Sequence, residues 1–290
     1  MQDSLKKPDW LKVSYNRDNV TEIESLMSKL NLNTVCREAN CPNIGECCSK
    51  HTATFMIMGQ NCTRNCRFCN VTCAKPTELD PEEPVNVAKA AKALGLKHAV
   101  VTSVTRDDLK DGGASHFAAT IRAIHEISPE TTVEVLIPDL KGDENALNTV
   151  LDANPDVLNH NVETVKELYG TVRPQAIYER SLEVLRYCKS ARPDIRTKTG
   201  FMVGLGETDE QITELMRDIY TTGCDILTIG QYLRPSKEHA ELKRYVTPEQ
   251  FDEYKKTALK MGFKFVASSP LARSSYKAFE ALQASMAENE

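Results

Sequence analysis

Three cysteines stand close together in the segment CTRNCRFC, at positions 62, 66 and 69. Thiolates spaced this closely can surround one face of a compact cluster, and an iron–sulfur cubane takes four ligands. Because Cys62, Cys66 and Cys69 supply only three ligands, one iron would keep an open position. An open iron can bind a small chelating molecule and pass an electron to it, so we predict that these three residues are catalytic as well as metal-binding.

Two other kinds of metal site could use the same cysteines. Structural zinc sites usually pair two Cys-x2–4-Cys knuckles across a spacer, which a single compressed triplet does not resemble. A closed, ferredoxin-type cluster would recruit Cys73 as its fourth ligand. The first gap, however, holds three residues instead of two, and Pro76 does not directly follow Cys73. We therefore interpret Cys73 as a bystander, with a non-catalytic electron carrier as an alternative.

A second triplet lies upstream, where Cys36, Cys41 and Cys47 form a C-x4-C-x5-C pattern. Near the C-terminus the chain reads Arg-Ser-Ser-Tyr, and the second serine of this motif is Ser275. On residue type alone, a hydrogen-bonded turn is favoured over a metal ligand for Ser275. Two thiolate triplets indicate two clusters with different tasks.

Composition and charge exclude several classes of protein. The 290 residues are 41% hydrophobic and 27% charged, which is ordinary for a globular chain. The formal net charge of −5 disfavours a nucleic-acid partner, because nucleic-acid-binding proteins usually carry a basic excess. No run approaches the roughly 20 consecutive apolar residues of a membrane span, and the N-terminus lacks a signal-peptide core. We expect a cytoplasmic protein with no membrane partner, where clustered cysteines indicate metal binding or catalysis.

The elements that must position these residues follow a regular alternation. Short apolar runs predict strands at 52–58, 98–104, 131–137, 156–160, 195–203 and 225–230, with a candidate edge strand at 263–267. Helical patterns follow at 84–95, 114–127, 144–153, 177–191, 208–222 and 247–261. Six strand–helix alternations favour an α/β fold with a parallel sheet, curled into a barrel or part of one. An open doubly wound sheet is the rival. In a barrel, chemistry lies at the C-terminal ends of the strands, where the 62–69 triplet falls.

The C-x3-C-x2-C motif, with Phe68 before its last cysteine, resembles the signature of the radical S-adenosylmethionine (SAM) superfamily. The pairing of C-x4-C-x5-C with RSSY closely resembles the lipoyl synthase family. Further similar segments are CPNIGEC, VTSVTRDDLKDGGA, EVLIPD, DVLNHNVETV, GLGET, DILTIGQYL and RYVTPEQF, so the resemblance runs from roughly Lys7 to Tyr276. It implies a partial (β/α)6 barrel of the TIM type over residues 51–262. Residues 1–50 would be an N-terminal extension with the auxiliary-cluster cysteines, and residues 263–290 a C-terminal extension with RSSY.

The resemblance also implies the ligands of two [4Fe–4S] clusters. Cys62, Cys66 and Cys69 would hold the cluster that binds and cleaves SAM. The auxiliary cluster would be held by Cys36, Cys41, Cys47 and the hydroxyl oxygen of Ser275, which would take part in catalysis. Polar residues at strand ends are expected to contact SAM, and we assign this role to Thr102, Asn161, Glu163 and Arg173.

The reaction that the resemblance implies is the insertion of sulfur at C6 and C8 of an octanoyl chain. That chain is bound to a lysine of a lipoyl-carrier domain or a glycine-cleavage H protein. These carbons have no acidifying neighbour, so no base of ordinary pKa could remove their protons, and radical chemistry is required. The auxiliary cluster would supply both sulfurs. Further implied partners are a flavodoxin- or ferredoxin-type electron donor and cluster-assembly proteins. A biotin synthase-like sulfur inserter is the enzymatic alternative, but that family lacks the upstream triplet.

Overall fold

The computed structural model describes residues 6–12, 25–35, 43 and 54–287. Eight strands form one sheet whose spatial order follows the chain, so each strand pairs with the next. β1 is antiparallel to β2, and every later pair is parallel. The strands are β1 (Asn33–Thr34), β2 (Thr54–Ile57), β3 (His98–Ser103), β4 (Thr132–Leu136), β5 (Val157–Asn159), β6 (Arg196–Val203), β7 (Ile226–Gln231) and β8 (Phe265–Ser269).

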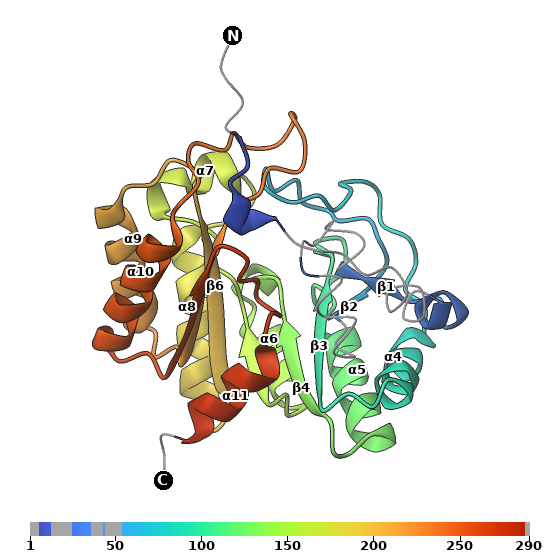
Figure 1. Cartoon of the computed structure of the whole chain (residues 1–290). Coiled ribbons are helices and arrows are strands. Elements are labelled where there is room, and N and C mark those ends of the chain that lie inside the picture. Colours follow the sequence, from blue (N-terminus) through green and yellow to red (C-terminus); the bar gives the residue numbers. More distant parts are fainter. Residues whose placement is uncertain (1–5, 13–24, 36–42, 44–53, 288–290) are drawn as a thin grey trace.

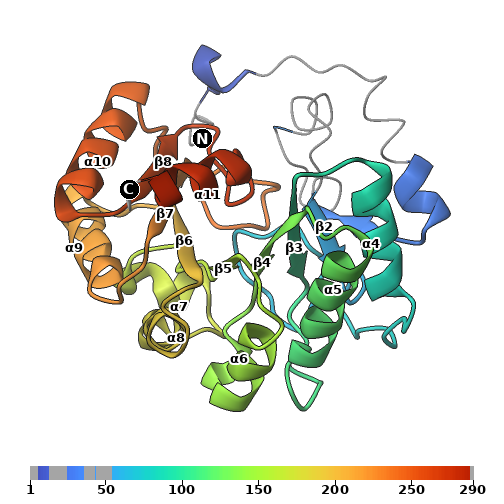
Figure 2. The same cartoon turned by 90° about the horizontal axis from the view of Figure 1, so that it is seen from below.

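This order decides between the two predicted architectures. A doubly wound sheet reverses its strand order at a switch point, whereas here the winding never reverses. The sheet curls, and its helices cover the outer surface (Figure 2). The predicted partial barrel is confirmed, and the candidate edge strand is β8, parallel to β7. Part of the segment 263–290 thus extends the sheet, while the proposed division into barrel and extensions stays an interpretation.

The helices follow the strands as the periodicity predicted. The main ones are α4 (Glu83–Ala93), α5 (Ala114–Ile127), α6 (Glu144–Leu151), α8 (Tyr178–Ala191), α9 (Asp209–Tyr220) and α10 (Pro248–Met261), with shorter turns η1 (Asp9–Leu11), η2 (Leu140–Gly142), η3 (Lys166–Leu168) and α7 (Tyr169–Val172). Local caps fix several boundaries. The Thr208 side chain accepts from the Gln211 amide at the start of α9, and Thr247 does the same for Gln250 at the start of α10.

Two apolar clusters stabilise the layer between sheet and helices. The first packs β2 to β5 against α4, α5 and α6, around residues such as Phe117 and Ile121. The second packs β6 to β8 against α8, α9 and α10, around residues such as Leu215 and Phe251. β7 is buried along its whole length, as expected for a parallel strand covered on both faces. Two apolar cores, one under each half of the sheet, therefore hold the helices against the curved sheet.

A further helix, α11 (Ala278–Ala287), was not predicted from the sequence. It contacts β8 and β3, so it bridges the first and last parts of the open barrel (Figure 1). The rings of Phe279 on α11 and His98 at the start of β3 lie 6.1 Å apart. Since β3 starts at His98, α11 lies toward the N-terminal ends of the strands, opposite the end expected to carry the chemistry.

A buried ion pair fills the interior of the barrel between these two ends. Lys198 Nζ donates to both carboxylate oxygens of Glu134 at 2.9 Å, and Asn159 Nδ2 donates to the same carboxylate at 2.9 Å. Burial alone would raise the pKa of Glu134, but the charges of Lys198 and His98 outweigh it and lower the pKa to about 2. The Glu134 carboxylate is thus paired with one cation and one amide donor, as a buried charge requires. Within the described residues, no helix has the length and apolarity needed to cross a bilayer.

Candidate active site

The cysteine triplet lies in the loop that follows β2, at the C-terminal end of the parallel strands. The loop is joined to the next strand's loop, because the Thr63 amide and hydroxyl both donate to the carbonyl of Thr105, at 3.0 and 2.9 Å. In return, the Thr105 amide donates to the Cys62 sulfur at 3.2 Å, and the Arg64 amide donates to it at 3.4 Å. The Cys62 sulfur therefore accepts hydrogen bonds from two backbone amides.

The other half of the loop is covered by the segment after β7. The Ala240 amide donates to the Arg67 carbonyl at 2.7 Å, and His239 Nε2 donates to the Cys69 carbonyl at 3.0 Å. Phe68 packs against a small apolar cluster that includes Tyr232. Backbone contacts from segments distant in sequence therefore fix the loop.

All three thiols are free, and their environment fits an iron–sulfur cluster better than a single ion. Burial raises the pKa of Cys66, with the positive charge of Arg173 opposing, and burial raises the pKa of Cys69 to about 12. Such thiols become thiolates when a metal centre compensates their charge. No three His, Cys, Asp or Glu side chains among the described residues converge closely enough for one metal ion. Three free cysteine thiols on one loop are the ligand type that an iron–sulfur cluster takes, so Cys62, Cys66 and Cys69 suit such a cluster in their chemistry.

Three of the four predicted SAM contacts come together beside Cys66. Asn161 Nδ2 donates to the carboxylate of Glu163 at 3.1 Å, and Arg173 Nη1 donates to the carbonyl of Asn161 at 3.1 Å. Glu163 has a positive φ of 74°, which is uncommon for a residue other than glycine and is found at strained functional sites. Burial raises its pKa, although Arg173 opposes this. These three side chains offer one carboxylate, one amide and one guanidinium. Such groups suit the ammonium and carboxylate groups of an amino acid.

Arg173 is held by a buried hydrogen-bond chain. Its Nη1 donates to the Tyr169 hydroxyl at 2.6 Å, and that hydroxyl lies 2.7 Å from Ser181 Oγ. Ser181 Oγ lies 3.0 Å from His160 Nε2, while His160 Nδ1 donates to the Ile137 carbonyl at 2.9 Å. Burial, with the charge of Arg173, lowers the pKa of His160 to about 4, so the ring is neutral. Arg173 Nε is buried and has no partner among the described residues, which leaves a donor for a ligand.

The fourth predicted SAM contact is placed differently. Thr102 lies on β3 and is buried, and its hydroxyl donates to the Leu136 carbonyl on β4 at 2.9 Å. The hydroxyl is therefore used by the sheet, and a role of Thr102 in SAM binding stays a prediction.

The auxiliary-cluster cysteines Cys36, Cys41 and Cys47 lie outside the described residues. Within this stretch of sequence the structure describes Asn43, which stands between the second and third of these cysteines and is 2% exposed. Asn43 Nδ2 donates to the Leu271 carbonyl at 2.8 Å, four residues before Ser275. On the other side of the same segment, Asn161 Nδ2 lies 2.8 Å from the hydroxyl of Ser274. Leu271, just before the RSSY segment, thus contacts Asn43, and Ser274 within that segment contacts Asn161 in the proposed SAM site.

Sequence reasoning missed a charged cluster behind the cysteine loop. Arg64, within the triplet, is 6% exposed and pairs with Asp107 after β3 and Asp139 after β4. The neighbouring Asp108 pairs with a different arginine, Arg106. An arginine between two cysteines was the available signal, but its partners lie 43 and 75 residues away.

The comparisons with known proteins agree with this geometry. The model of the radical SAM superfamily matches residues 56–219, which run from β2 through α9. Solved structures with little sequence identity share the fold. Methylornithine synthase aligns with a TM-score of 0.53 at 15% identity over 89% of this chain and 80% of its own. Streptococcus suis SuiB bound to S-adenosylmethionine aligns with a TM-score of 0.57 at 12% identity, over 85% and 60% of the two chains.

The chain is a radical SAM enzyme by fold and by family. Among curated relatives, the lipoyl synthase of Caldanaerobacter subterraneus subsp. tengcongensis is 58% identical over 275 residues, 95% of this chain and 96% of the relative. That of Rubrobacter xylanophilus is also 58% identical over 275 residues, 94% and 86% of the two chains. Within the superfamily, this chain belongs to the lipoyl synthase family.

Proposed function

We propose that this chain inserts two sulfur atoms into a protein-bound octanoyl group, at C6 and C8, and so makes the lipoyl cofactor. Family membership over 95% of the chain carries this assignment, and the barrel-mouth arrangement of Cys62, Cys66 and Cys69 supports it. As a radical SAM enzyme, the chain uses SAM and a [4Fe–4S] cluster. Cys62, Cys66 and Cys69 would hold this cluster, which would supply a binding position for SAM and the electron for its cleavage.

The protein's own residues then hold and orient the SAM molecule. Glu163 and the carbonyl groups at the strand ends would accept from its ammonium group, while the free Nε donor of Arg173 would pair with its carboxylate. The buried chain from Tyr169 to His160 would keep the Arg173 guanidinium in place during each turnover. One SAM molecule is consumed for each C–H bond broken, so two are needed for a product with two sulfurs.

A second [4Fe–4S] cluster would be held by Cys36, Cys41, Cys47 and the oxygen of Ser275, and would give up its sulfur. The hydrogen bond from Asn43 to Leu271 supports this set of ligands, because it joins the cysteine motif to the segment that carries Ser275. A serine alkoxide is a harder ligand for iron than a thiolate, and its release would open one corner of the cluster.

The substrate would be an octanoyl-lysine on a lipoyl-carrier domain or a glycine-cleavage H protein. An electron donor of the flavodoxin or ferredoxin type would supply one electron for each SAM. Cluster-assembly proteins would rebuild the auxiliary cluster after each product, and the reaction would take place in the cytoplasm.

One anaerobic experiment tests the whole proposal. The chain is incubated with SAM, a reductant and an octanoyl-lysyl peptide, and mass spectrometry measures whether two sulfur atoms are added. Metal analysis of the same preparation should find roughly eight irons and roughly eight sulfides per chain, as two four-iron clusters require. Zinc with no product would support a binding module instead. A product formed with only one four-iron cluster would refute the second cluster.

A further inference from the structure

Arg64, Asp107 and Asp139 form a charged cluster behind the cysteine loop, and none of the three has a role in the proposed reaction. Arg64 Nε and Nη2 donate to the two carboxylate oxygens of Asp107 at 2.7 and 2.9 Å, in the bidentate arrangement that makes this pairing strong. The same Nη2 donates to Asp139 Oδ1 at 2.7 Å. The guanidinium therefore spans two carboxylates from two different loops.

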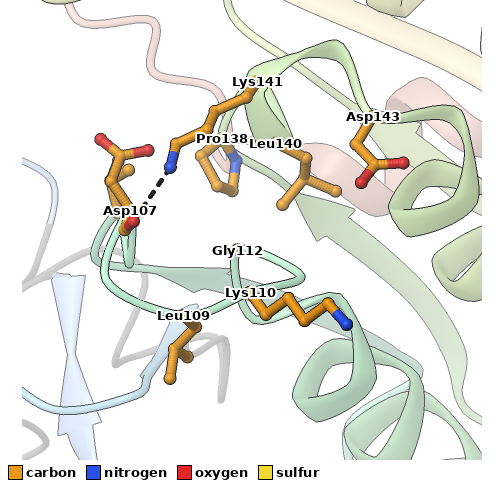
Figure 3. A pocket seen from close by; sticks show the side chains of 9 residues that line it. Asp107, Leu109, Lys110, Gly112, Pro138, Leu140, Lys141 and Asp143 are labelled. Carbon is orange, nitrogen blue, oxygen red and sulfur yellow. Dashed lines mark hydrogen bonds between the residues drawn. The ribbon is translucent and has the colours of Figure 1, made fainter.

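Each partner is itself fixed in place. The Asp107 amide donates to the Thr63 hydroxyl at 3.1 Å, and Lys141 Nζ donates to the Asp107 carbonyl at 2.9 Å (Figure 3). Asp139 is fully buried, its Oδ1 also accepts from the Lys141 amide at 3.1 Å, and its Oδ2 lies 3.5 Å from Arg180. The three loops after β2, β3 and β4 thus meet at a single guanidinium.

The loop that presents Asp139 adopts an unusual conformation. Leu140, Lys141 and Gly142 have φ values of 44°, 57° and 74°, so two residues with side chains are left-handed in succession. Leu140 is buried, and it lines a pocket between the loops after β3 and β4, with Asp107 and Lys141 on the same wall (Figure 3). Such strain persists only where surrounding contacts over-determine the conformation, and it is concentrated at functional sites. Here it turns the chain back so that Asp139 faces Arg64.

We propose that Arg64 is a positioning residue, which uses Asp107 and Asp139 to hold the cysteine loop in its cluster-binding shape. The clamp acts at the backbone between Cys62 and Cys66, because Arg64 lies between them. With the clamp intact, Thr105 and Arg64 keep their amides aimed at the Cys62 sulfur. Without the clamp, the cysteine loop moves relative to β3. The three cysteine sulfurs then no longer keep the relative positions that hold the cluster. This inference rests on the proposed function only in taking the triplet as the ligands of the SAM-binding cluster.

The test measures how fast the full-length, anaerobically prepared protein loses iron to a colorimetric chelator. To observe one cluster alone, the rates are compared in a Cys36→Ala/Cys41→Ala/Cys47→Ala background. In Arg64→Ala we expect release at least about tenfold faster, since a charge-assisted, bidentate contact is lost. Arg64→Lys keeps the charge but cannot span both carboxylates. Its rate of iron release should therefore lie between that of the background protein and that of Arg64→Ala. The spectrum of the reduced cluster on SAM addition should also differ from that of the unsubstituted background.

Matched controls separate the clamp from a general loss of charge. Arg67→Ala removes an exposed arginine of the same loop, whose side chain donates to the Glu238 carbonyl, and should leave the release rate within about twofold. Asp107→Asn should speed release, whereas Asp108→Asn, on the neighbouring ion pair, should not. If Arg64→Ala does not fold, Asp107→Asn decides the matter, because its side chain is 27% exposed and tolerates replacement. Iron release at the background rate in a folded Arg64→Ala or Asp107→Asn protein would overturn the proposal.

The outcome is separable from that of the proposed function. A wild-type protein that adds no sulfur to the peptide, but whose Arg64→Ala variant loses iron rapidly, would keep the clamp and reject the sulfur insertion. A wild-type protein that adds two sulfurs, with unchanged iron release in Arg64→Ala, would support sulfur insertion and reject the clamp.

Discussion

Asn161 and Ser274 are 113 residues apart in sequence, and the Asn161 amide nitrogen lies 2.8 Å from the Ser274 hydroxyl oxygen. Asn161 stands at the end of β5 with Glu163 and Arg173, and Ser274 is the residue before the proposed cluster ligand Ser275. The contact joins the proposed site of SAM to the proposed ligand of the sulfur-donating cluster. A side-chain hydrogen bond thus connects the residue next to Ser275 with the group that contains Glu163 and Arg173.

Replacing Ser274 with Ala should slow sulfur insertion without removing either cluster. A hydrogen bond of this kind contributes about 1 kcal/mol, so we expect a loss of roughly fivefold in rate. The measurement is product formation by mass spectrometry, together with iron per chain. Ser275→Ala is the comparison, and it should impair sulfur insertion far more strongly. Equal rates for Ser274→Ala and the wild type would show that the contact does not order the segment.

Replacing Cys66 with Ala should abolish SAM cleavage, because the SAM-binding cluster loses a third of its protein ligands. Iron of the auxiliary cluster should remain. Liquid chromatography of 5′-deoxyadenosine measures the first effect, and metal analysis measures the second. Cys73→Ala is the matched control, since Cys73 is an exposed thiol outside the triplet, and it should cleave SAM at the wild-type rate. Continued deoxyadenosine formation by Cys66→Ala would refute the ligand assignment.

Replacing Cys41 with Ala should have the opposite effect. We expect SAM still to be cleaved, because the triplet at 62–69 is intact, whereas no thiolated octanoyl product should form. Both products can be quantified in one reaction, with Cys188→Ala as a control for a buried cysteine far from either motif. Detection of a thiolated product would show that the two clusters do not divide the work in this way.

Replacing Lys198 with Met should destabilise the barrel strongly. The substitution leaves the Glu134 carboxylate buried without its main partner, and breaking a buried pair in this way costs about 3–5 kcal/mol. Urea unfolding measures the free energy. A second change, Glu134→Leu, should recover most of the loss, because it removes the unpaired charge. A Lys198→Met protein as stable as the wild type would mean that the carboxylate is neutral or hydrated.

Acidification should weaken the fold through His160 before the carboxylates are affected. The pKa of His160 is lowered to about 4 in the folded protein, while an unfolded histidine titrates near 6.5. The unfolded chain therefore binds more protons between these values, so this contribution is complete above pH 6.5 and falls as the pH drops toward 4.

The slope of this loss should approach about 1.4 kcal/mol per pH unit, and the total is on the order of 3 kcal/mol. Urea unfolding at several pH values between 7 and 5 measures it. In His160→Gln the slope should be smaller, since the remaining side chain does not titrate there. The same slope in both proteins would assign the acid sensitivity to other groups.

Much of this fold could be predicted from the sequence, because its signals are local. The run at 195–203 became β6 with one residue's difference, and the helix predicted at 247–261 is α10, which begins at Pro248. Hydrophobic periodicity and caps depend on neighbours within a few residues, so they can be read along the chain. The cysteine spacing is equally local, and it indicated the superfamily before any contact was known.

Other features depended on the tertiary structure, because their partners are far apart in sequence. The sequence around Arg64 does not predict its contact with Asp139, and the sequence around Ser274 does not predict its contact with Asn161. α11 has little local signal beyond its alanines, and its position against β3 follows from the open edge of the barrel that it covers. Sequence alone therefore indicated the parallel strands, the helices between them and the spacing of the cysteines, but not β1 or α11. Only the closure of the sheet decided which charges and hydroxyls face those thiolates, since burial and pairing are properties of the folded chain.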